Sequence, residues 1–119
     1  RIRMATITPT VDSNSNPKGI VVVTWASIGD SDTCTGVTTA QYNRKCFQVK
    51  GTFGSATVIA QGSNDAGTTY AALTDKGQTA IALTAAGIEE VGENPLMIRP
   101  SSSGGSGSST TVVLVLSKD

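Results

Sequence analysis

A seventeen-residue run in the middle of the chain constrains the fold more than any other feature. It reads GTFGSATVIAQGSNDAG from Gly51 to Gly67, and its glycines divide it into short segments. Val58 and Ile59 are β-branched residues of the kind that favour strands. The run Ser63–Gly67 combines side chains that bond to nearby backbone with a glycine that accepts a positive φ, as is typical of turns. The run therefore predicts a compact β-hairpin.

Similar short segments recur along the chain at spacings of about ten residues, each bounded by turn residues. They predict strands at residues 2–8, 20–26, 42–53, 56–61, 70–73, 79–83, 96–99 and 110–116. The continuous β-branched run at 20–26 predicts a strand buried on both faces, by the domain core and by something else. We expect an all-β single domain, an antiparallel β-sandwich or jelly roll over residues 11–119, preceded by an N-terminal arm or first strand at 1–10.

One short helical turn is expected at Thr84–Val91, where Thr84 supplies an N-cap. Gly87 weakens this turn by about 1 kcal/mol, and Pro95 ends it. On such a turn Glu89 and Glu93 stand four positions apart, so the two carboxyl groups could act as a general acid and a general base. A solvated helix face is the commoner explanation of such a pair.

The run Ser101–Ser109, SSSGGSGSS, has the composition of a flexible linker. The ten residues that follow it are too few to fold alone, so they must return to the sheet. We therefore expect a mobile hairpin loop at this position.

Composition argues against catalysis and against nucleic acid as a partner. Nine basic and nine acidic residues give a formal net charge of zero, which provides no electrostatic footprint for nucleic acid. The chain has no histidine, the commonest general base and metal ligand. No Ser or Thr has an activating partner in a sequence motif, and no phosphate-binding loop occurs. We predict no enzyme, no catalytic residue and no cofactor; with no long apolar run or signal peptide visible, we also predict no membrane partner.

The candidate metal and thiol groups have structural interpretations. Cys34 and Cys46 match no zinc or redox spacing, and we expect them to be reduced, although a disulfide between them could stabilise by about 3 kcal/mol. Carboxylates in Asp30–Asp32 and Asn64–Asp65 could bind calcium, but neither loop has the EF-hand spacing. Structural turns are expected at both, and no metal site is predicted.

A family resemblance covers Ser27 to Leu116. It is carried by GTFGSATVIAQGSNDAGTTYAALTD, then Gly77, then TAAGIEEVGENPLMIRP, a Gly/Ser loop and a hydrophobic C-terminal strand. This series resembles small virion proteins of tailed bacteriophages, whose segments look like GTFGGATVTLQGSNDG, W-x-x-L-T-D, TAAGI, E-E-N-P and Y-I-R-P. Tyr70 stands where Trp is usual, and Ser101–Ser109 replaces a V-x-T-G-G-D-G loop.

The resemblance implies a capsid decoration (cement) protein or another head or tail component. It implies a β-sandwich in many copies, a homotrimer bound to the major capsid protein, and a place on the capsid exterior after assembly in the bacterial host cytoplasm. For protein contact we predict Ile2, Met4 and Ile7, in an arm that adds a strand to a neighbour. Gly104 and Gly105 mark a loop that faces outward or toward a neighbour.

Two alternatives remain open. Gly62–Asp65 followed by Tyr70 also resembles a hairpin of discoidin-type β-sandwich domains, which bind sugars or membrane surfaces. A carbohydrate-binding module is disfavoured because the chain is shorter than such domains and its few aromatic residues are needed for the core. The other alternative is a tail or baseplate subunit of the same fold.

Overall fold

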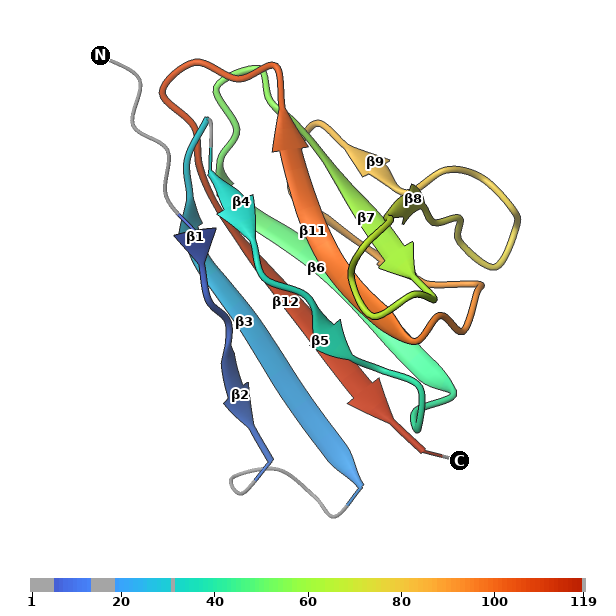
Figure 1. The fold of residues 1–119 in the computed structure, drawn as a ribbon. Helices are drawn as coiled ribbons and strands as arrows, with labels where there is room; N and C mark the ends of the chain where they lie inside the picture. The colour runs from blue at the N-terminus through green and yellow to red at the C-terminus, as the bar shows by residue number, and fades with distance from the viewer. Residues whose placement is uncertain (1–5, 14–18, 31, 119) are drawn as a thin grey trace.

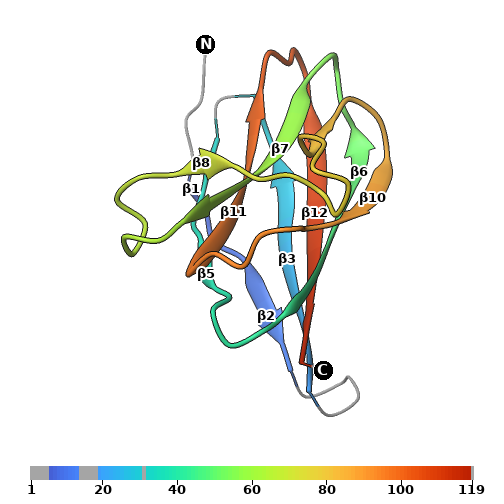
Figure 2. The ribbon, with the colours of Figure 1, turned by 90° about the vertical axis from the view of Figure 1, so that its right-hand side faces the viewer.

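The computed structural model describes residues 6–13, 19–30 and 32–118. Two antiparallel sheets pack face to face (Figures 1 and 2), and the described residues contain no helix. The predicted all-β sandwich is therefore confirmed. Sheet I has the order β10-β6-β12-β3-β2, with bounds Gly87–Glu90, Arg44–Thr52, Ser109–Ser117, Ile20–Ile28 and Thr10–Asp12.

Sheet II has the order β5-β11-β7-β8, and β9 also pairs with β7. The bounds of these strands are Val37–Thr38 for β5, Met97–Ser103 for β11, Thr57–Ser63 for β7, Ala71–Ala72 for β8 and Ala82–Leu83 for β9. A parallel pair of β1 (Thr6–Ile7) and β4 (Thr33–Cys34) forms a separate two-stranded sheet.

The core lies between the two sheets and follows the two-residue period of the strands. Trp25 is fully buried on β3, and its indole N–H donates to the backbone oxygen of Thr35 at 2.8 Å. Burial of each large apolar side chain contributes about 1.5–3 kcal/mol. The other fully buried apolar side chains from the long strands are Val23, Ile28, Phe47, Val49, Val58, Ala60, Ile98, Val112, Leu114 and Leu116.

The strand expected at 20–26 extends to Ile28, and the domain core covers one of its two faces. Val23 and Trp25 point into the core, whereas Val22 and Thr24 on the other face are only half-buried. Sheet II packs against one face of this strand, so the aliphatic run leaves its other face partly open to solvent.

The expected helical turn is wrong. Gly87–Glu90 forms β10, which pairs antiparallel with Cys46–Val49. Gly87 makes a helix costly here, and the exposed edge of β6 offers the backbone of this segment a full set of partners. Glu89 and Glu93 therefore do not share a helix face.

The predicted hairpin at Gly51–Gly67 is correct only in its second half. β7 and β8 pair antiparallel around the Ser63–Gly67 turn. β6 and β7, however, belong to different sheets, and the turn between them carries the chain across the sandwich. The Ser101–Ser109 segment likewise joins β11 in sheet II to β12 in sheet I, so it is a cross-sheet arch rather than a hairpin loop.

The remaining strand predictions differ mainly in length. β8 and β9 are shorter than expected, and β11 is longer because Ser101–Ser103 continue the ladder with β7. β2, β4 and β5 form where mainly loop was expected. Of the predicted strand at 2–8, β1 lies at Thr6–Ile7, and the residues before it fall outside the described part of the chain.

Candidate functional site

The outer face of sheet I carries an aliphatic row that crosses its central strands. Val115 on β12 is paired with Val22 on β3 and with Cys46 on β6. Paired residues of an antiparallel ladder project to the same face, so the three side chains lie side by side. All three are half-buried, and the strands of sheet II pack against the opposite face of the sheet (Figure 2).

A second row lies beside the first. Val113 is paired with Thr24 on one side and Gln48 on the other, and Gln48 is paired with Ile88 on the edge strand β10. The Ile88 side chain is 60% exposed, the largest exposure among the large apolar residues that the structure describes. We call Val22, Val113, Val115, Cys46 and Ile88 the sheet I apolar patch.

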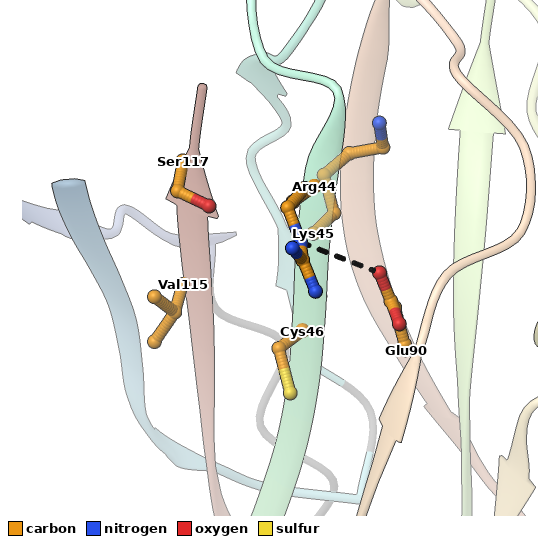
Figure 3. Close-up of a pocket in the computed structure, with 6 residues that line it drawn as sticks. All are labelled: Arg44, Lys45, Cys46, Glu90, Val115 and Ser117. Carbon is orange, nitrogen blue, oxygen red and sulfur yellow. Dashed lines mark ion pairs between the residues drawn. The ribbon is translucent and has the colours of Figure 1, made fainter. Parts of the chain in front are cut away.

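A shallow pocket of about 170 Å³ borders this patch (Figure 3). Its rim carries charge, because Glu90 Oε2 lies 4.0 Å from Arg44 Nε and 3.8 Å from Lys76 Nζ. These pairs are exposed to solvent and contribute little to stability. The six residues that line the pocket are Arg44, Lys45, Cys46, Glu90, Val115 and Ser117.

Neither cysteine is an activated thiol. Burial raises the pKa of Cys34 to about 12, and Asp32 adds to the effect. Burial and the nearby Glu90 carboxylate raise the pKa of Cys46. Cys34 belongs to the core while Cys46 lies on the outer face of sheet I, and both are free thiols. The expected burial holds for Cys34, whereas Cys46 is only half-buried.

Three of the five predicted contact residues, Ile7, Gly104 and Gly105, lie in the described part of the chain. Ile2 and Met4 lie outside the described residues. Ile7 is half-buried in β1 and packs against the core of its own chain. Gly104 adopts a φ of +76°, and Gly105 is half-buried in the arch between β11 and β12, where an added Cβ would lie 2.8 Å from Ala56 Cβ. Sequence reasoning did not single out the sheet I apolar patch, although the run at 20–26 hinted at a second covered face.

The carboxylates considered as calcium ligands accept hydrogen bonds from loop backbone instead. Asp30 accepts hydrogen bonds from the backbone of Gly107 and Ser108 at 2.8 and 2.9 Å. Asp65 accepts from the backbone of Thr69 at 2.8 Å. Within the described residues, no group of three or more His, Cys, Asp or Glu is placed to hold a metal ion.

The acidic residues near β10 also have structural contacts. Glu93 accepts a hydrogen bond from the backbone N–H of Thr74 at 2.8 Å, and bonding to the Thr74 hydroxyl lowers the pKa of Glu93. Hydrogen bonding with Asp75 raises the pKa of Glu89. The geometry provides a carboxyl pair at the surface.

Tyr70, considered as a sugar platform, is engaged within the chain. The Arg99 guanidinium lies 3.8 Å from the centroid of its ring, and Arg99 also donates to Gln61 Oε1 at 2.9 Å. One face of the ring is thus covered by a cation–π contact.

No known protein family model and no curated protein sequence matches this chain. In the described part of the chain, no helix is long and apolar enough to span a membrane.

Proposed function

We propose that this protein is a structural component of a tailed-bacteriophage virion, a decoration (cement) protein that binds neighbouring major capsid subunits on the head exterior. The observation that carries the proposal is the sheet I apolar patch. Its members Val22, Val115 and Cys46 form an aligned row on a sheet face that the described chain leaves partly open. Contiguous apolar patches on a protein surface mark sites where a partner binds.

The electrostatics of the chain suit permanent assembly. A net charge of zero opposes neither self-association nor contact with a capsid. The motifs from Ser27 to Leu116 that resemble small phage virion proteins support the same assignment. The protein acts without catalysis: it assembles in the bacterial cytoplasm, buries apolar area against capsid subunits, and gains avidity as a homotrimer.

The carbohydrate-binding alternative has less support. Its platform needs an open aromatic face, and the Tyr70 ring is already covered by Arg99 on one side. A tail or baseplate subunit would use the same patch against a different neighbour, so the binding experiment includes purified tails.

The test is co-sedimentation with purified heads and tails that lack the protein. Val115→Arg places a charge in the middle of the sheet I apolar patch and should weaken head binding by at least about tenfold, which corresponds to 1.4 kcal/mol. Ile59→Arg is the matched control, because Ile59 is a half-buried β-branched residue on the outer face of sheet II. It should leave binding unchanged.

Failure of the wild-type protein to bind heads overturns the proposal, and binding to tails alone establishes the tail alternative. Light scattering on a size-exclusion column then tests the trimer, and a clean monomer on and off the capsid contradicts it.

A further inference from the structure

Lys45 is a charged side chain at a core position. It points inward from β6, in the alternation that also buries Phe47 and Val49, and it is 1% exposed. Lysine is almost never fully buried unless it is paired. Its Nζ donates to the backbone oxygen of Tyr42 at 3.1 Å and to Asn94 Oδ1. Both of these acceptors are uncharged, so neither offsets a buried positive charge.

This environment makes the charged form of the amine less favourable than it is in water. Burial lowers the pKa of Lys45 and nearby Lys76 lowers it further, while Glu90 acts in the opposite direction. A deprotonated lysine is a nucleophile, whereas an ammonium group is not. The group that Lys45 Nζ touches is a carboxamide, whose Cγ is an electrophilic carbon.

The backbone around Asn94 holds the carboxamide in place. Three residues before it, the Val91 N–H donates to the backbone oxygen of Lys45 at 2.9 Å. On its other side, the Thr39 hydroxyl donates to the backbone oxygen of Pro95 at 3.0 Å. Because the reacting side chains come from two segments already bonded to each other, their effective concentration is far above that of free groups in solution.

We propose that Lys45 and Asn94 form an intramolecular isopeptide bond. After Lys45 Nζ loses one proton to solvent, its lone pair attacks Asn94 Cγ, and a new C–N bond forms. The bond from Cγ to Nδ2 breaks, a proton passes from Nζ to Nδ2, and ammonia leaves. The step needs no oxidant, reductant or cofactor, and it does not depend on the proposed virion function.

The bond would join the two sheets covalently. Lys45 lies on β6 of sheet I, and Asn94 lies in the segment that enters β11 of sheet II. The two residues are 49 positions apart, so the cross-link closes a long loop and restricts the unfolded chain as a disulfide does. Unlike a disulfide, it would resist reducing agents.

The experiment is intact-mass spectrometry of the purified, folded and then denatured protein, followed by tandem spectrometry of its proteolytic fragments. We expect the wild-type mass to fall short of the sequence mass by one ammonia molecule. The fragments should include a branched peptide joining Lys45 to Asn94. Lys45→Met and Asn94→Ala should each show their full sequence masses.

Asn64→Ala is the matched control, because the Asn64 carboxamide accepts a hydrogen bond from the Leu96 N–H, whereas Lys45 donates to Asn94. This variant should still lose ammonia. A full sequence mass for the wild-type protein overturns the proposal without any variant. Ammonia loss that persists in Lys45→Met also overturns it, since another amide would then be the source.

Discussion

The backbone N–H of Ser108 donates to Asp30 Oδ1 at 2.9 Å, although the two residues are 78 positions apart. The Gly107 N–H donates to the other carboxylate oxygen at 2.8 Å, and the Ser108 hydroxyl also bonds to Asp30. One carboxylate thus holds the glycine- and serine-rich arch through three hydrogen bonds. The expected mobile loop is held by a residue that sequence analysis weighed as a calcium ligand.

Replacing Asp30 should loosen this arch. Asp30→Ala removes every acceptor for the Gly107 and Ser108 donors, and the midpoint of thermal unfolding should fall while the circular dichroism spectrum stays that of a β protein. Asp12→Ala, on the edge strand β2, serves as a comparison outside the arch. An unchanged midpoint in Asp30→Ala would show that the clamp does not contribute to stability.

Stability should fall in acid through the same contact. Hydrogen bonds from the Ser108 side chain and backbone, and then from Gly107, lower the pKa of Asp30 below its usual 3.8. A carboxyl whose folded pKa is depressed stabilises the fold above its unfolded pKa, and this contribution is lost as pH falls through the folded value. Denaturant unfolding from pH 6 down to about pH 3 should show a decline that is shallower in Asp30→Asn. Equal slopes in the two proteins would contradict the assignment.

Substitution of Gly54, in the turn from β6 to β7, should destabilise the protein more than substitution of Gly107, in the arch from β11 to β12. Gly54 has a φ of +55°, and an added Cβ would lie 2.3 Å from the backbone oxygen of Ser106. Gly107 has a φ of +69°, with nothing within 4 Å of the added atom. Gly107→Ala should cost about 1–2 kcal/mol for backbone strain alone.

Gly54→Ala introduces the same backbone strain as Gly107→Ala. It also disrupts the hydrogen bond from the Ser106 N–H to the Gly54 oxygen, which measures 2.8 Å. Its free energy of unfolding in urea should therefore fall by more than that of Gly107→Ala. Equal losses in the two variants would mean that the arches do not constrain each other.

The two faces of β12 should differ in their tolerance of truncation. Leu114 is fully buried, so Leu114→Ala should cost about 2–5 kcal/mol from lost transfer energy and a residual cavity. Val115→Ala, on the half-buried outer face of the same strand, should cost less. Urea unfolding of both variants measures the difference, and a larger loss for Val115→Ala would reverse the inward and outward assignment.

The two thiols should react at different rates. With its pKa raised to about 12 by burial, Cys34 should not react with a thiol reagent at pH 8 until the protein unfolds. Cys46 is half-buried and should react more slowly than a free thiol but before Cys34. Cys46→Ser should abolish labelling of the native protein, and rapid labelling of that variant would contradict the burial of Cys34.

The sequence alone determined the fold class and most of the long strands. Runs of β-branched and apolar residues bounded by turn residues are local signals, so the strands containing Trp25, Phe47 and Leu114 could be located without knowing their partners. The short strands β2, β4 and β5 carry too few residues for such a signal. The helical turn at 84–91 was mispredicted because TAAGIEEV has a helix-like spacing, whereas the free edge of β6 decided its backbone conformation.

Tertiary structure decided which strands share a sheet and which partner each polar side chain bonds to. A turn at Gly54 looks the same in sequence whether it closes a hairpin or crosses the sandwich, because the choice depends on which distant strand, β12 or β11, completes the ladder. The sheet I apolar patch and the contact of Lys45 with Asn94 also depend on long-range strand pairing. Both bring together residues that are far apart in the chain, and the pairing of β6 with β12 and β10 places these residues side by side.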